Sequence, residues 1–232
     1  MKKVFIIAAA LIAALPVAQA TTYLYSFTGT SGTVSSPHDF TGNGSYPITI
    51  WGMTYSTLTQ AGTGSTAVYS FSGGAVSNLS LNATNGLGVV GTCNEITVPG
   101  ACGSAGSYAV VDFADTGNPG GPEGHGYTAA TITIDNADSG WTIYGGTSFT
   151  SSSGGITGLT KLVSGTSKGI SNTYNQLVSL TGYAYLVITA GPTSCELNVN
   201  SISVSTPEPG TFVMAGMALI GLGMALRKAR KG

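Results

Sequence analysis

Residues 131–134 read Thr131-Ile132-Thr133-Ile134, and residues 185–188 read Tyr185-Leu186-Val187-Ile188. In the first stretch isoleucine alternates with threonine, which puts the apolar side chains on one face of a β-strand. The second stretch is apolar throughout, as expected for a strand that is covered on both faces. Residues 21–206 contain no stretch with convincing helical spacing of apolar residues. These patterns predict an all-β fold.

Other short apolar runs lie along residues 21–205, and glycine and asparagine residues separate them. Such runs, rich in β-branched residues and bounded by turn formers, are typical of strands. About ten to twelve strands at this spacing predict a single β-sandwich, jelly-roll-like or immunoglobulin-like. The segment is long enough to bury a sizeable core of its own.

The last predicted strand, residues 196–205, has apolar residues in two phases. They are Leu197 and Val199 before the change of phase, and Ile202 and Val204 after it. Because a one-residue shift turns side chains to the opposite face, a regular strand would expose one of these pairs. We therefore predict a β-bulge near Asn200-Ser201 that returns both pairs to the core; the alternative is a strand that is apolar on both faces.

The C-terminal residues 206–232 have three parts. Pro207-Glu208-Pro209 comes first, an uncharged apolar segment follows at 211–226, and the basic residues Arg227, Lys228, Arg230 and Lys231 come last. An uncharged helix can lie in lipid because its backbone hydrogen bonds are all internal. We therefore predict a transmembrane helix at 211–226, with the four cations on the cytoplasmic side.

This three-part tail resembles the PEP-CTERM sorting signal of exported proteins of Gram-negative bacteria. The resemblance implies that an exosortase-type protease processes the tail, so that the protein is tethered to the inner membrane first and is later at the cell surface or outside the cell. Many family members accompany exopolysaccharide, which implies a structural or interaction role linked to exopolysaccharide or biofilm. Gly210, directly after the motif, departs from the small hydroxyl residues or alanine common there.

The N-terminal residues 1–20 have the features of a secretory signal peptide. Lys2 and Lys3 precede an apolar segment at 4–15, and Ala18-Gln19-Ala20 precedes Thr21. A charged start, an apolar core and a small-x-small site are the signature of a segment that is removed on export. We therefore predict cleavage between Ala20 and Thr21.

The segment between the two ends is acidic and sparsely charged. Residues 21–209 contain two lysines against nine carboxylates, a net charge of −7. Because basic surfaces supply most of the affinity for nucleic acid, this composition excludes a nucleic-acid partner. Membrane, an exosortase-type protease and polysaccharide are the partners expected.

Three cysteines, Cys93, Cys102 and Cys195, are present. Export places them in an oxidising compartment, where disulfides persist. We predict a bridge between Cys93 and Cys102, which are close in the chain, while pairing of Cys195 with either of them stays open.

Two groups of residues are candidates for ligand binding. Asp112, Asp115 and Glu123 lie in and before a loop rich in glycine and proline, and clustered carboxylates are ligands that calcium prefers. The alternative is that they are solvated carboxylates and that the protein has no cofactor. Trp141 follows a turn and is a candidate for stacking on sugar, although the core interpretation is favoured.

The expected role is not enzymatic, and no catalytic residues are assigned. A carbohydrate-binding module is the alternative function, and a glycoside hydrolase using Asp112 and Glu123 is a third. Residues 86–91, Gly-Leu-Gly-Val-Val-Gly, satisfy the GxGxxG dinucleotide pattern. That site needs a helix after the turn, so we reject a dinucleotide function in this β-rich segment.

Overall fold

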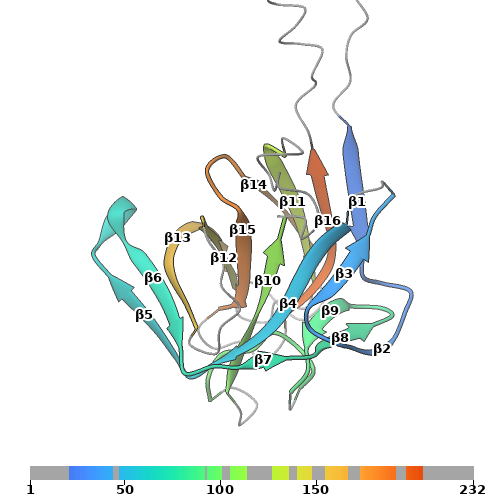
Figure 1. Cartoon of the computed structure of the whole chain (residues 1–232), viewed down its shortest axis with the longest axis horizontal. Helices are drawn as coiled ribbons and strands as arrows, with labels where there is room; N and C mark the ends of the chain where they lie inside the picture. The colour runs from blue at the N-terminus through green and yellow to red at the C-terminus, as the bar shows by residue number, and fades with distance from the viewer. Residues whose placement is uncertain are drawn as a thin grey trace, which may run out of the picture. The chain divides into compact units, whose positions relative to one another are not determined.

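The computed structural model describes residues 21–43, 47–91, 93–100, 105–113, 127–135, 140–147, 155–166, 173–191 and 197–205. Within these ranges the unit Thr22–Ser205 contains sixteen β-strands and one short 3-10 turn, η1 (Gly64–Thr66), and no α-helix (Figure 1). The all-β prediction is confirmed. There are more strands than the ten to twelve expected, because several have only two to four residues and show no readable alternation.

The strands form two sheets in which every pair is antiparallel. The seven-stranded sheet has the order β14 (Tyr174–Ser179), β11 (Ala129–Asp135), β16 (Asn198–Ser205), β9 (Gly86–Val89), β8 (Leu79–Asn82) and β2 (Gly32–Val34), with β1 (Thr22–Ser26) also paired to β16. The nine-stranded sheet has the order β3 (His38–Thr41), β4 (Pro47–Tyr55), β10 (Gly106–Asp112), β15 (Tyr185–Ala190), β12 (Trp141–Gly146), β13 (Ile156–Gly165), β6 (Val68–Ser72) and β5 (Thr57–Ala61), with β7 (Val76–Ser77) beside β4. This arrangement is consistent with the predicted sandwich.

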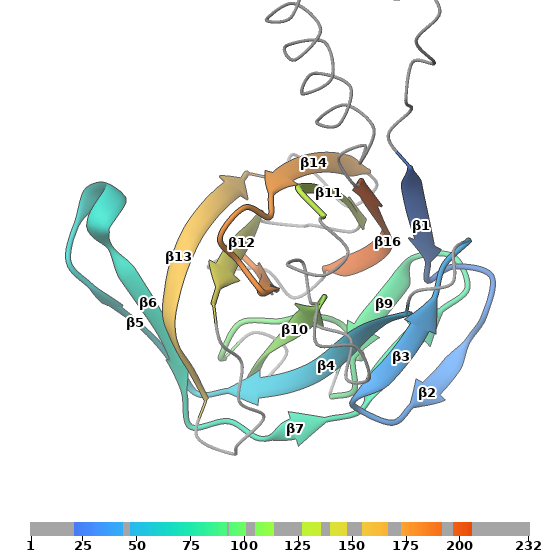
Figure 2. The same ribbon diagram turned by 45° about the horizontal axis from the view of Figure 1, so that its top comes forward.

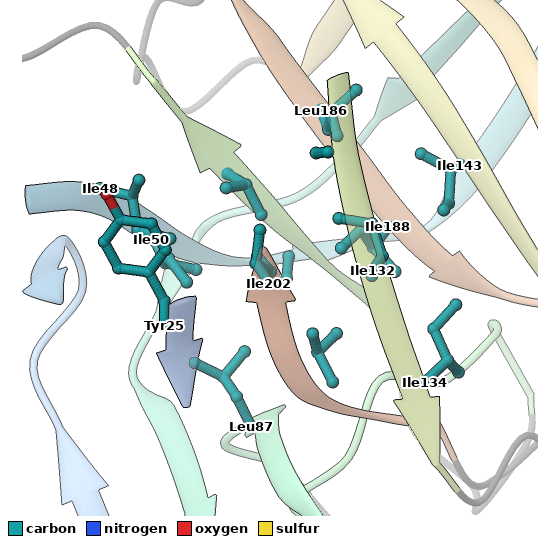
Figure 3. Packing of buried hydrophobic residues seen from close by; sticks show 14 of the residues in the cluster. Tyr25, Ile48, Ile50, Leu87, Ile132, Ile134, Ile143, Leu186, Ile188 and Ile202 are labelled. Atoms are coloured by element: carbon teal, nitrogen blue, oxygen red, sulfur yellow. The ribbon is translucent and has the colours of Figure 1, made fainter. Parts of the chain in front are cut away.

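The main core contains residues from both sheets. Ile132 and Ile134 of β11 are fully buried, and they belong to the same cluster as Ile50 of β4 and Ile188 of β15 (Figure 3). The intervening threonines of β11 are only partly buried. The alternation of isoleucine and threonine in the sequence therefore matches the alternation of buried and partly buried side chains along the strand. Each isoleucine buried in this way stabilises the fold by about 1.5–3 kcal/mol.

The predicted bulge in the last strand is present. In the ladder between β11 and β16, Thr133 lies opposite Ser201 and Ile134 lies opposite Val199, so that Asn200 is the extra residue. As a result the apolar residues on both sides of the bulge are buried: Leu197, Val199, Ile202 and Val204. The Asn200 side chain donates a hydrogen bond from Nδ2 to Asp135 Oδ2 at 2.9 Å, which ties the bulge to β11.

The nine-stranded sheet bends strongly, a feature that the sequence did not predict. β4 and β6 are five positions apart in the sheet, which would separate them by about 24 Å if it were flat. Yet the rings of Tyr55 on β4 and Phe71 on β6 have centroids 4.9 Å apart, and Ser56 N donates to Ser72 O at 3.0 Å. Figure 2 shows β13 and β6 curving round toward the end of β4.

This bend encloses a second cluster that is rich in tyrosine. Tyr55, Tyr108, Tyr144 and Tyr185 are all buried in it. Burial raises the pKa of each of these phenols above its usual value of 10, and for Tyr144 and Tyr185 it raises the pKa to about 12.

Three predicted segments lie outside the described residues: the signal peptide 1–20, the apolar segment 211–226 and the basic end. In the ranges that are described, no helix is long and apolar enough to cross a membrane.

Candidate functional site

The carboxylates predicted from the sequence are only partly covered by the structure. Asp112 is half-buried at the end of β10, where it lies opposite Thr49 of β4 and Tyr185 of β15. Burial, and then the charge of Asp112, raise the pKa of Tyr185. Asp115 and Glu123 lie outside the described residues, so the calcium site and the carboxylate pair of a hydrolase stay predictions. The described residues contain no group of three or more His, Cys, Asp or Glu side chains that could hold a metal.

Trp141 lies in the core. It is the first residue of β12 and 4% exposed, and it belongs to the cluster between the two sheets. Its indole is packed so closely on β13 that a Cβ built on Gly165 would lie 2.6 Å from the ring. The face of this ring is therefore not open for stacking on a sugar.

Cys93 is in a disulfide bond. Cys102 and Cys195 lie outside the described residues, so the pairing of Cys93 with Cys102 stays a prediction.

A polar hollow of about 360 Å³ lies beside β8 and β16 of the seven-stranded sheet, and we call it the Glu95 hollow. Its hydrogen-bonding side chains are Ser31, Thr33, Ser80, Asn82, Asn94, Glu95 and Asn198. Ser80 and Asn198 alternate along their strands with the core residues Leu79 and Val199, so they point to the outer face of the sheet. The sequence analysis missed this site, because its residues come from four segments far apart in the chain.

One glycine of the rejected dinucleotide pattern, Gly88, makes room for one wall of the hollow. Residues 86–89 form β9, and all four are buried. A Cβ at Gly88 would lie 2.3 Å from the carbonyl oxygen of Asn94 and 2.8 Å from Cα of Glu95. Glycine is needed here because the segment 94–95 crosses directly over the strand, a role that requires no cofactor.

The wall formed by residues 93–97 is held on several sides. Ile96 N donates to Leu197 O at 2.9 Å, which ties the segment to the residue before β16. Ser107 Oγ donates to Glu95 O at 3.0 Å, and the Cys93 disulfide fixes the start of the segment. Asn94 has φ 57°, the one positive φ among the non-glycine residues that the structure describes. Asparagine tolerates this left-handed conformation better than most residues.

The side chains around the hollow are fixed by hydrogen bonds of their own. Asn82 Oδ1 accepts from the backbone N–H groups of Thr84 and Asn85, at 2.9 and 3.0 Å. Asn94 Oδ1 accepts from Gly91 N at 3.4 Å. Because each oxygen is bound to backbone, each amide presents its NH₂ group as a donor.

The floor of the hollow contains a buried amide. Asn198 is 2% exposed and donates from Nδ2 to Glu95 Oε1 at 3.3 Å. Ser31 Oγ accepts from Ala83 N at 3.2 Å, which leaves its hydroxyl hydrogen as a donor. None of the described residues that line the hollow is lysine, arginine or histidine. The described residues of the lining are therefore neutral donors and acceptors together with one carboxylate, that of Glu95.

Comparison with known proteins identifies the C-terminal segment. Residues 205–231 match the family model of the PEP-CTERM protein-sorting motif. The chain carries this sorting signal, which implies export, processing by an exosortase and membrane association. No curated protein and no solved structure shows significant similarity to the chain.

Proposed function

We propose that this exosortase-targeted exported protein has a structural or interaction role at the cell surface or in the extracellular matrix, linked to exopolysaccharide or biofilm. The observation that carries the proposal is the position of the sorting match. It begins at Ser205, the last residue of β16, and Pro207 follows two positions later. The β-rich unit is therefore the cargo that the signal exports.

The pairing of β1 with β16 supports processing at both ends. Thr22 lies directly opposite Ser205, and β1 begins two residues after the predicted cleavage site at Ala20. Neither the predicted signal-peptide cleavage after Ala20 nor the sorting motif that begins at Pro207 falls within a strand of the described unit. In this proposal residues 1–20 are a signal peptide, and residues 211–226 hold the unprocessed chain in the inner membrane.

The composition of the exported part supports a binding or structural role. Between residues 21 and 209 there are only two cations, so solubility depends mainly on neutral hydrogen-bonding groups and on the carboxylates. Such a surface is compatible with a hydrated polysaccharide matrix. The sandwich is proposed to be jelly-roll-like or immunoglobulin-like, a fold class that often presents binding surfaces.

A carbohydrate-binding module is the second candidate function. The Glu95 hollow favours it, because most of the hydrogen-bonding side chains that line it are neutral and one of them, Asn198, is a buried amide. The calcium hypothesis for Asp112, Asp115 and Glu123 stays a prediction that calorimetric titration of the full chain with calcium tests.

The sorting proposal is tested in a Gram-negative host with and without its exosortase. The full chain is followed by immunoblot in cytoplasmic, membrane and extracellular fractions. We expect a shortened product outside the inner membrane only when the exosortase is present. A variant with Pro207→Ala, Glu208→Gln and Pro209→Ala should remain unprocessed in the membrane, whereas the adjacent Gly210→Ala control should be processed normally. Finding the mature chain in the cytoplasm would refute the proposal.

A further inference from the structure

We propose that two copies of this chain associate through β5, with the two β5 strands side by side and antiparallel. A two-fold axis between the strands would join two nine-stranded sheets into one continuous sheet. Neither the sorting signal nor a ligand takes part in this contact, so the contact is independent of the sorting proposal.

β5 is the last strand of its sheet and is open along one side. Within the part of the chain that the structure describes, it pairs with β6 alone, through five regular positions from Thr57 to Ala61. All five residues of β5 are exposed. Figures 1 and 2 both show the β5–β6 hairpin at the outer end of the sheet. Because the open side of an edge strand presents backbone N–H and C=O groups to solvent, a further strand can pair with it.

The features that commonly protect the edge of a sheet are not present in β5. Short length, charged side chains, proline and bulges are the usual devices against strand addition. β5 has five residues, contains no charge and no proline, and has no bulge in its ladder with β6. Of the four strands that end the two sheets, β2, β3, β5 and β14, it is the one whose residues are all exposed.

The absence of charge around β5 in the sequence favours a second copy of the chain as the partner. Residues 40–94 contain no Lys, Arg, His, Asp or Glu, although residues 21–209 have a net charge of −7. Two copies of an acidic chain repel each other, so a contact between them is favoured where charge is lacking. The same uncharged stretch offers no electrostatic attraction to a protein of the opposite charge.

The side chains of β5 are suited to pairing with those of an identical strand. If Leu58 lies opposite Leu58 of the second copy, Thr57 lies opposite Thr59 on both sides of it. Leu58 is 39% exposed, and its ladder partner on β6 is the buried Phe71. The pairing would cover the exposed part of Leu58, and the flanking threonine pairs are of a kind that stabilises antiparallel sheets.

The small size of this contact predicts weak association. One strand of five residues buries much less than the roughly 800 Å² per partner of a stable interface. We therefore expect Kd on the order of 100 µM for free chains. Copies held on one membrane by the sorting signal would meet at a higher effective concentration.

The test is sedimentation equilibrium of the full chain in density-matched detergent, at about 5 to about 500 µM, which brackets the expected Kd. We expect an equilibrium between monomer and dimer. Leu58→Lys places two like charges opposite each other at the centre of the contact, and should weaken dimerisation by about tenfold or more. Leu177→Lys on β14 is the matched control, because Leu177 is 65% exposed and also lies on an end strand. This control should dimerise as the unchanged chain does.

A mixed sample separates lost pairing from lost folding. Leu58→Lys and Leu58→Glu chains should each be largely monomeric, whereas an equal mixture of the two should dimerise, because a cation then faces a carboxylate. The proposal is overturned if the unchanged chain stays monomeric, as it would if β5 served a different protein. It is also overturned if Leu58→Lys dimerises as strongly as the unchanged chain, if Leu177→Lys is weakened equally, or if the mixture stays monomeric. Monomeric chains that are processed normally refute this inference alone, and dimeric chains that stay unprocessed refute the sorting proposal alone.

Discussion

Substitution of Gly88 by alanine tests whether the close approach of residues 94–95 to β9 explains the glycine pattern. The new Cβ would lie 2.3 Å from the Asn94 carbonyl oxygen, which is backbone and cannot rotate away. The segment would have to move by about 1 Å, and overpacking of this kind costs about 1–3 kcal/mol of the free energy of unfolding. In a unit of this size that loss lowers Tm by about 2–4 °C per kcal/mol.

Gly91→Ala is the matched control, because it lies in the same GxGxxG pattern and a Cβ there meets nothing within 4 Å. We expect its Tm to stay within the range of an ordinary surface change, about 0.5 kcal/mol. Urea unfolding and thermal melting of the full chain in detergent measure both variants. Equal stability of the two would show that the backbone contact does not dictate glycine at position 88.

Two further predictions concern the tyrosine cluster and the bulge. Because burial raises the pKa of Tyr144 and Tyr185 from 10 to about 12, their neutral forms stabilise the fold fully below pH 10. This contribution should be lost as pH rises from 10 through 12, and a Tm that stays constant across this window would contradict it. Asp135 accepts hydrogen bonds from Thr173 Oγ1 at 2.5 Å and Asn200 Nδ2 at 2.9 Å, so Asp135→Ala should lower the free energy of unfolding by about 1–3 kcal/mol. Denaturation by urea measures this loss, and Asp39→Ala, an exposed carboxylate with one hydrogen bond from Thr49, should cost less.

Local patterns were enough to predict the strands and one irregularity within them. The alternation of isoleucine and threonine at 131–134 is a property of one strand, so it can be recognised without knowing which strands pair with it. The bulge at Asn200 was also predictable from the strand alone. The apolar residues change phase within its sequence, and a one-residue insertion is what buries both apolar pairs.

Features that depend on distant segments were not predictable from the sequence. The bend of the nine-stranded sheet depends on contacts such as that of Phe71 with Tyr108, whose centroids are 4.6 Å apart, between strands that are not neighbours. The spacing of Gly86 and Gly88 was visible in the sequence as part of the GxGxxG pattern. The sequence does not show, however, which backbone segments lie against these glycines. The Glu95 hollow was missed for the same reason, since no local motif joins Asn82, Asn94 and Asn198.

The position of β16 within its sheet determines how the unit bears mechanical load. Residues 201–205 lie between β1 and β11, with five paired positions on one side, and the full ladder with β11 contains seven. Tension applied to the chain just after Ser205 acts along the direction of β16. The hydrogen bonds to β1 and β11 are then loaded in shear and together, and are not broken one at a time. A force applied to the chain after Ser205 would therefore extract the last strand less easily than it would extract a strand at the edge of a sheet.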